Sequence, residues 1–276
     1  MTRKMLLILV FLILGLILIY RFFVFNPSNL QITKKEIYFS NLPEFLDGAK
    51  ILHLSDFHSW WFGKREKRVL KFAQNLNPDF IFITGDFVDF QTSFFDKNLT
   101  SLKKFWGRLS QKFPQRVFGV PGNHDNFFVL KALNECGIEI LINASKKISF
   151  KNGYFYLIGV DDPWTKRDNL KKAMSKANKE NSFKILLSHS PDIISKAKEE
   201  KIDLILAGHL HGGQITLPFF GPLWVPSRYG SKYLKGLFKE NSTYLYVNSG
   251  VGTSILPLRI NSSPEISLII LKRYEN

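Results

Sequence analysis

Two histidines spaced two residues apart, His209 and His211, are the clearest sign of chemistry in this sequence. The pair directly follows the apolar run at residues 205–207, and glycines flank it on both sides. Residues i and i+2 at the end of a strand point to the same face, so both imidazoles can reach one metal ion or two neighbouring ions. The glycines allow the backbone to turn sharply beside a bound group. A His-x-His pair alone is common by chance, so its meaning depends on the other histidines.

Four more apolar runs are followed within three residues by Asp, Asn or His. The runs lie at residues 51–54, 80–84, 117–120 and 185–187, and the residues that follow them include Asp56 and His58, Asp86, Asn123 and His124, and His189. Ligands of open α/β sheets bind outside the carboxyl ends of the strands, so we expect these side chains to gather at one edge. His53 is the exception because it lies within a predicted strand, and we interpret it as a packed histidine.

Seven of these residues have the side-chain types of metal ligands: Asp56, His58, Asp86, Asn123, His189, His209 and His211. Oxygen ligands mixed with imidazoles suit manganese, with iron or zinc as alternatives. Seven ligands are too many for one ion and suit two ions that share a carboxylate. Two ions about 3.5–4 Å apart can polarise phosphoryl oxygens and lower the pKa of a bridging water, so that hydroxide attacks phosphorus. Each residue alone has an ordinary alternative, such as a turn former, but the set predicts a binuclear centre.

The order of these blocks is Asp56-x-His58, Gly85-Asp86-x-x-Asp89, Gly122-Asn123-His124-Asp125, His189 and Gly208-His209-x-His211. This order resembles the calcineurin-like metallophosphoesterase family over most of the chain after its N-terminal segment. The resemblance implies an α/β fold, a four-layer α/β/β/α sandwich of two mixed sheets. It also implies that one metal is held by Asp56, His58 and His211, the other by Asn123, His189 and His209, and that Asp86 bridges the two.

The same resemblance implies catalytic roles for His124 and Asp125. His124 would donate a proton to the leaving oxygen, and Asp125 would steady its ring. A histidine suits this task because its pKa lies near neutral pH.

A second, looser resemblance is to a membrane-linked branch of the family. It rests on the N-terminal hydrophobic segment, on residues 54–58 and 208–214, and on the stretch at 248–253. That branch includes exported phosphodiesterases and an enzyme that cleaves the pyrophosphate of UDP-2,3-diacylglucosamine. The resemblance alone does not identify the substrate of this chain.

The N-terminal segment carries no charge between residues 5 and 20, where it reads MLLILVFLILGLILIY. With Arg21 and residues 22–25 it makes about 21 apolar residues, or roughly 32 Å of helix, which is enough to cross a bilayer. We therefore predict a single-pass anchor in the inner membrane over residues 1–25, a linker over 26–30 and a catalytic domain over 31–276. Basic residues flank the segment almost evenly, so the positive-inside rule leaves the side of the catalytic domain open.

Strands and short helices must place the site residues. The pattern predicts strands at 30–39, 50–55, 79–84, 116–120, 138–142, 147–150, 154–160, 183–187, 203–206, 244–248 and 266–271, and helices at 64–74, 98–112, 127–135, 168–179 and 192–199. Strands alternate with helices early and dominate later, which indicates an α/β sandwich of two sheets. A chain of 276 residues, 45% of them hydrophobic, can bury the core of one such domain.

The formal net charge of +15 indicates either an anionic partner or a lysine-rich solvated surface. The anionic partner would be a phosphate-bearing substrate, an acidic lipid or a nucleic acid. The single cysteine, Cys136, excludes an internal disulfide and a cysteine-based zinc cluster.

Two apolar loops follow the first and last metal blocks, at residues 59–63 and 217–226. They either contact lipid or acyl chains, as interfacial aromatic residues do, or they pack against the core. Lys64, Arg65 and Arg228 follow these loops and are our candidates for substrate binding.

Our leading hypothesis is a membrane-anchored, two-metal phosphodiesterase or pyrophosphatase. Its substrate would be lipid-linked, such as UDP-2,3-diacylglucosamine or a phospholipid. One alternative is a nuclease or phosphatase of the same family with a soluble substrate, although the anchor and the apolar loops argue against nucleic acid. The other is a metal-binding membrane protein without turnover.

Overall fold

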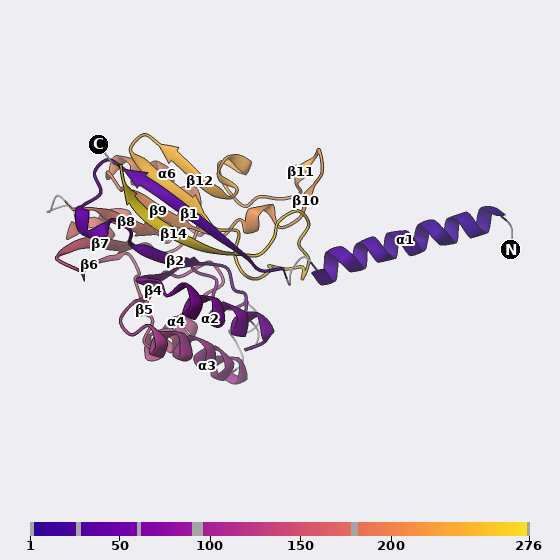
Figure 1. Cartoon of the computed structure of the whole chain (residues 1–276), viewed down its shortest axis with the longest axis horizontal. Coiled ribbons are helices and arrows are strands. Elements are labelled where there is room, and N and C mark those ends of the chain that lie inside the picture. The colour runs from indigo at the N-terminus through magenta and orange to yellow at the C-terminus, as the bar shows by residue number, and fades with distance from the viewer. Residues whose placement is uncertain (1–2, 26–28, 60–61, 90–95, 178–181, 275–276) are drawn as a thin grey trace.

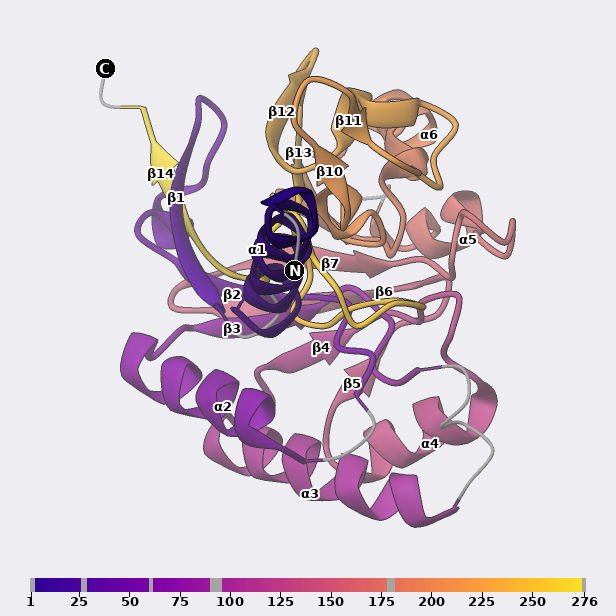
Figure 2. The same cartoon turned by 90° about the vertical axis from the view of Figure 1, so that its right-hand side faces the viewer.

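Two six-stranded sheets pack face to face, and helices cover their outer faces (Figures 1 and 2). The computed structural model describes residues 3–25, 29–59, 62–89, 96–177 and 182–274. Both sheets contain parallel and antiparallel pairs, so the prediction of an α/β sandwich of mixed sheets is confirmed.

The first sheet runs in the order β1-β14-β2-β3-β4-β5. Strands β2 to β5 are parallel, whereas β14 is antiparallel to β2 and parallel to the edge strand β1. The bounds are β1 (Gln31–Phe39), β2 (Lys50–Leu54), β3 (Phe80–Ile83), β4 (Val117–Gly119), β5 (Glu139–Ile140) and β14 (Glu265–Arg273). The carboxyl ends of β2, β3 and β4 therefore meet at one edge, as the sequence predicts.

The second sheet runs in the order β12-β13-β9-β8-β7-β6, with antiparallel pairs only at its two edges. The bounds are β6 (Ala144–Phe150), β7 (Gly153–Gly159), β8 (Lys184–Leu187), β9 (Leu204–Ala207), β12 (Gly236–Glu240) and β13 (Thr243–Val247). Strand β12 and a short hairpin of β10 (Thr216–Leu217) and β11 (Gly221–Pro222) were not predicted. Their residues are mostly only half-buried and form no alternating apolar pattern.

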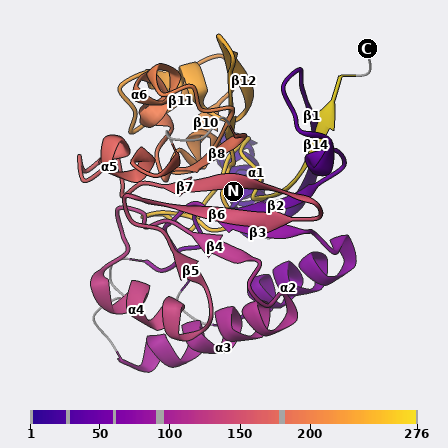
Figure 3. The same ribbon diagram turned by 90° about the vertical axis from the view of Figure 1, so that its left-hand side faces the viewer.

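Three hydrophobic layers hold the sandwich together. Between the sheets lie side chains such as Phe82, Leu157 and Leu206. The outer face of the first sheet is covered by α2 (Lys64–Leu76), α3 (Asp96–Lys112) and α4 (Phe127–Glu135). The second is covered by α5 (Leu170–Met174) and α6 (Ile194–Glu199). Figures 2 and 3 show the two helical layers on opposite sides of the sheets. Within the described residues, the helix predicted at 168–179 covers only the five residues of α5.

Short 3-10 turns lie between the larger elements, at η1 (Glu44–Leu46), η4 (Pro191–Ile193), η5 (His211–Gly213) and η6 (Gly230–Tyr233). The η5 turn contains the second histidine of the His-x-His pair.

The N-terminal helix α1 (Arg3–Phe25) extends away from the two sheets (Figure 1). Between Met5 and Tyr20, the large apolar side chains described are 44–71% exposed. Within the described part of the chain, none of the helices has the length and apolar character needed to cross a bilayer. The helix is therefore observed, but the predicted transmembrane anchor is not supported. Residues 26–28 of the predicted linker lie outside the described residues.

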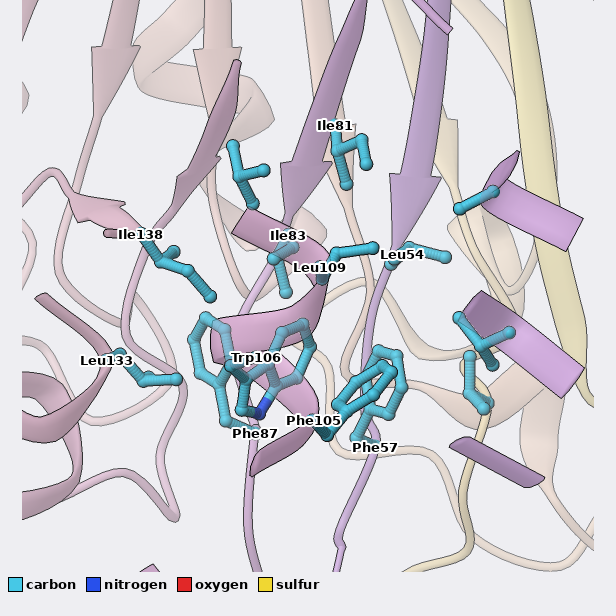
Figure 4. Packing of buried hydrophobic residues seen from close by; sticks show 14 of the residues in the cluster. Leu54, Phe57, Ile81, Ile83, Phe87, Phe105, Trp106, Leu109, Leu133 and Ile138 are labelled. Atoms are coloured by element: carbon cyan, nitrogen blue, oxygen red, sulfur yellow. The ribbon is translucent and has the colours of Figure 1, made fainter. Parts of the chain in front are cut away.

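Helix α3 anchors two of the loops that carry site residues. Phe57 lies between Asp56 and His58, and its ring centroid is 4.7 Å from that of Trp106. Phe87 follows Asp86, and its ring is 5.1 Å from the same indole. Figure 4 shows both rings beside Trp106, which is fully buried. One α3 side chain thus holds the loops after β2 and β3 in place.

Replacing this indole tests the anchoring. We expect Trp106→Ala to lower the free energy of unfolding by about 3–5 kcal/mol, because it removes a large buried ring and leaves a cavity. The measurement is urea unfolding of the metal-free protein. Phe127→Ala is the control, because its ring is 71% exposed and should cost under about 0.5 kcal/mol. Equal stability of the two variants would contradict the anchoring role.

Candidate metal centre

The structure brings all seven predicted ligand residues together between the carboxyl ends of strands from both sheets. Asp56 and His58 follow β2, Asp86 follows β3 and Asn123 follows β4, while the remaining three, His189, His209 and His211, follow β8 and β9. All are buried except Asn123, which is half-buried. His53 lies apart, within β2, where its Nε2 is 2.9 Å from the Thr84 hydroxyl in the core, as we interpreted it.

Asp56, His58 and His211 form one compact group. Their ligand atoms lie within 4.8 Å of one another. Nε2 of His58 is 3.2 Å from Nε2 of His211, which is 3.5 Å from a carboxylate oxygen of Asp56. This is the set that the resemblance implies for one metal.

The Asp86 carboxylate lies between this group and a second one. Its Oδ2 is 3.4 Å from Nε2 of His58 and 3.3 Å from Nε2 of His189. Its other oxygen accepts a hydrogen bond from the backbone N–H of His124 at 2.9 Å. One carboxylate oxygen therefore faces imidazoles on both sides, which is the geometry that a bridging ligand requires.

His189 is the centre of the second group. Its Nε2 is 3.0 Å from Oδ1 of Asn123 and 3.1 Å from Nδ1 of His209. Its Nδ1 donates to the backbone carbonyl of Thr84, at 2.7 Å, so Nε2 is the ring nitrogen that faces the site. Such an orienting bond to the outer nitrogen is characteristic of metal-binding histidines.

The backbone at the site is strained. Asp56, His58, Asp86, His209 and His211 all have positive φ, between 43° and 72°. Non-glycine residues adopt this left-handed region at a cost of about 1 kcal/mol or more, and such residues cluster at functional sites. Hydrogen bonds between the loops hold the conformation, including Asp56 N–H to the Gly85 carbonyl at 3.0 Å and His58 N–H to the Asp86 carbonyl at 3.1 Å.

Two glycines allow these loops to approach closely. A Cβ atom on Gly122 would lie 2.1 Å from a carboxylate oxygen of Asp86, and one on Gly208 would lie 1.9 Å from the Ser55 hydroxyl. Any side chain at either position would displace the ligand loops.

Burial sets the charge of the imidazoles that face the cluster. It lowers the pKa of His58 and of His209 to about 3, so both rings are neutral, which is the form that binds metal. Burial also raises the pKa of Asp56 to about 6. For Asp86, burial would raise the pKa, but the charge and hydrogen bond of His189 hold it well below its usual value. For His189, burial would lower the pKa, but the charge and hydrogen bond of Asp86 outweigh burial and raise it.

This donor set fits divalent metal ions. Two carboxylates, one amide oxygen and four imidazoles point into one buried space, and buried charges normally need a partner or a metal.

His124 and Asp125 lie beside the cluster. Nε2 of His124 is 4.0 Å from Oδ2 of Asp86, and His58, Asp86 and His124 form a further group able to hold a metal. The Asp125 carboxylate accepts hydrogen bonds from the backbone N–H groups of Asp86 (2.8 Å), Phe87 (3.0 Å) and Gly122 (2.9 Å). Burial and the charge of Asp86 raise its pKa to about 7. Asp125 thus stabilises the turn that presents Asp86, and its predicted role on His124 stays a prediction.

Arg259 is a residue that sequence reasoning missed. It is fully buried and donates hydrogen bonds to the carbonyl oxygens of His211, Ser249, Gly250 and Gly252. Its guanidinium also lies 3.1 Å from Nδ1 of His211, and after burial it is the main cause of that ring's low pKa. Nothing local in the sequence marks Arg259, because its partners are far away along the chain.

The three predicted substrate-binding cations lie outside the cluster. Arg65 pairs with Glu66 at 2.8 Å and contacts the hydroxyl of Ser59. Arg228 has a half-exposed side chain 3.8 Å from Asp192, and Lys64 is exposed at the start of α2. Their roles remain predictions. Of the apolar loops, Trp60 and Trp61 lie outside the described residues, whereas Phe219, Phe220 and Trp224 are exposed rather than packed in the core.

Comparison with known proteins identifies the family. Residues 49–213 match the family model for calcineurin-like phosphoesterases. The chain is 32% identical over 255 residues to the metallophosphoesterase YkuE of Bacillus subtilis, an alignment that covers 90% of this chain and 87% of YkuE. It is 30% identical over 239 residues to the phosphodiesterase YaeI of Escherichia coli, covering 82% of this chain and 84% of YaeI.

Two further matches bear on architecture. A transmembrane protein with metallophosphoesterase domain from Danio rerio is 30% identical over 264 residues, covering 88% of this chain and 57% of that protein. The crystal structure of TT1561 from Thermus thermophilus superposes with a TM-score of 0.51 at 14% identity, covering 74% of this chain and 90% of TT1561. The fold, the clustered ligands and these matches agree with the resemblance in the motifs. The chain therefore belongs to the calcineurin-like metallophosphoesterase family and is a metal-dependent phosphoester hydrolase.

Proposed function

We propose that this protein is a membrane-associated phosphodiesterase or pyrophosphatase with a binuclear centre, most effective with manganese. The observation that carries the proposal is the Asp86 carboxylate, whose Oδ2 lies 3.4 Å from His58 and 3.3 Å from His189. Asp56, His58 and His211 would hold one ion and Asn123, His189 and His209 the other. Two ions so placed would supply Lewis-acid activation of the phosphoryl group and of a water nucleophile.

The protein's own groups position and protonate the reacting atoms. Asp86 and Asp56 would supply negative charge that offsets bound metal ions, and the loops that carry them are already fixed by backbone hydrogen bonds. His124 is half-buried at the rim of the cluster, where its ring can face a bound ester. It would give its proton to the leaving oxygen, which is the step that limits esters with poor leaving groups.

Helix α1 supports the membrane part of the proposal. Its described apolar side chains are exposed to solvent, which is costly unless they meet lipid or protein. Figure 1 shows α1 on the same side of the body as the β10–β11 hairpin, near which Phe219 and Trp224 are exposed. The relative from Danio rerio is named as a transmembrane protein. A phosphoester attached to a lipid, such as a phospholipid or UDP-2,3-diacylglucosamine, is the substrate class consistent with this arrangement.

Removing the shared carboxylate tests the binuclear centre. We expect Asp86→Ala to abolish hydrolysis of bis(p-nitrophenyl) phosphate and to lose tight metal binding, because one oxygen of this carboxylate faces imidazoles of both groups. Metal content by elemental analysis is the measurement. Glu135→Ala, which removes a surface carboxylate paired with Lys103, is the control and should retain both properties. Two tightly bound metals in Asp86→Ala would show that the bridging assignment is wrong.

Removing the imidazole of His124 should separate proton transfer from metal binding. We expect His124→Ala to retain its metals and to lose roughly 10²–10⁴-fold in turnover, the usual range for a lost general acid. Esters of p-nitrophenol should be affected less than alkyl esters, because p-nitrophenolate leaves without a proton. The measurement is kcat across a leaving-group series. Loss of metal would assign His124 to metal binding, and equal losses across the series would refute its role as general acid.

Charged residues in α1 test membrane attachment. We expect the full chain to sediment with phospholipid vesicles, and Leu12→Arg with Leu16→Arg to stay in the supernatant. The two arginines replace exposed apolar side chains of α1 that would lie against lipid. Sedimentation of the vesicles is the measurement, and a Leu-to-Ile pair at the same positions is the control. Recovery of the unmodified chain in the supernatant would contradict attachment through α1.

A further inference from the structure

A cavity of about 230 Å³ opens over the cluster of predicted metal ligands. Its floor is polar and includes Asp86, His124 and His209. Its walls are mostly apolar and are built by Trp164, Ile215, Leu223, Trp224, Ile255 and Leu256. A phosphate group needs the polar floor alone. The apolar walls therefore need a separate explanation.

One wall is held in a strained conformation. Ile255 has φ of +60°, in the left-handed region that a β-branched side chain rarely adopts, and its side chain is 84% exposed. Packing of Ile255 in the core therefore does not explain the strain. Strained residues persist only when their surroundings impose the conformation, and they cluster at ligand sites.

Gln214 imposes this conformation. Its Nε2 donates to the carbonyl oxygens of Ser254 (2.8 Å) and Leu256 (3.1 Å), and its Oε1 accepts from the backbone N–H of Ser254 (2.8 Å). Gln214 is itself at a positive φ of 39°, three residues after His211. The loop at residues 254–256 is thus attached to the same turn that carries the metal ligand, so its distance from the cluster is fixed.

Another part of the wall follows the β10–β11 hairpin. Leu223 and Trp224 line the cavity and are 64% and 65% exposed. On a third side, the Trp164 ring lies 5.7 Å from the His209 ring. Large apolar side chains from three separate segments therefore surround one polar floor, which is the usual composition of a site for a partly apolar small molecule.

We propose that this cavity is a specificity subsite for a hydrocarbon group, an alkyl or acyl chain attached close to the phosphorus on which the metal cluster acts. The proposal rests on the proposed phosphodiesterase function and names the part of the substrate that the cavity selects. Ile255, Leu256, Leu223 and Trp224 would contact this chain, and Gln214 is the positioning residue for the loop at 254–256. A hydrocarbon there leaves water, which favours binding by up to about fourfold for each methylene.

A series of p-nitrophenyl alkyl phosphates tests the subsite. Methyl, butyl and hexyl esters stay monomeric in water and differ only in the group that the cavity would bind. With the full chain in phospholipid nanodiscs and manganese present, we expect kcat/KM to rise with chain length, mainly through a lower KM. Calorimetric binding of hexylphosphonate against methylphosphonate gives the same comparison without turnover.

Variants of the wall should reduce this preference. We expect Leu256→Ser, and separately Gln214→Ala, to lower the hexyl-to-methyl ratio of kcat/KM by at least about fivefold. Ile142→Ser is the matched control, because Ile142 is 42% exposed but does not line the cavity, and it should keep the ratio of the unmodified protein. Circular dichroism confirms that each variant is folded. The two substitutions act by different means, so a folding defect in one leaves the other decisive.

The outcomes separate the two proposals. If the unmodified protein hydrolyses the methyl ester but shows no preference for longer chains, the subsite is refuted and the phosphodiesterase function stands. A preference that Ile142→Ser reduces as much as Leu256→Ser also refutes the subsite. If none of the esters is hydrolysed and neither phosphonate binds, the proposed function fails and the subsite fails with it.

Discussion

The desolvated carboxylate of Asp86 is the constraint on which the rest of the site depends. It is 1% exposed and faces the imidazoles of His58 and His189. A carboxylate removed from water must be compensated by hydrogen bonds or cations. The backbone N–H of His124 supplies one such bond, and Asp125 in turn stabilises the backbone on both sides of Asp86. The turn, its neighbouring acid and the facing histidines therefore form one interdependent unit.

The two-sheet architecture makes this unit possible. Ligands from β2, β3 and β4 approach from one sheet and those from β8 and β9 from the other, so neither sheet holds a complete set. The loops meet only because they adopt left-handed backbone at five ligand positions and because glycine occurs at closest approach. That strain is offset by buried aromatic packing below, where Trp106 contacts the rings next to Asp56 and Asp86. The core thus stabilises a site geometry that the local chain would not adopt.

The surroundings of the site differ sharply in polarity from its floor. Exposed apolar residues occur in α1, near the β10–β11 hairpin and in the loop at 254–256. Their association with a buried polar centre suits a substrate that has both a phosphoester and a hydrocarbon part. The proposed membrane association and the proposed subsite explain different parts of this apolar surface, because none of the described α1 side chains lines the cavity.

The sequence by itself determined the chemistry and most of the elements. Each ligand type occurs a few residues after a short apolar run. Such runs predict buried strands, so Asp56, Asp86 and His189 were identifiable as candidate ligands without a structure. Arg259, the backbone-holding role of Asp125 and the strained wall at Ile255 were decided only by the tertiary structure. Each of these three features depends either on partners that are distant along the chain or on a backbone angle. Distant partners and backbone angles leave no periodic pattern in the sequence. The N-terminal segment illustrates the same division: its helix follows from the local sequence, whereas what its exposed surface contacts depends on its surroundings.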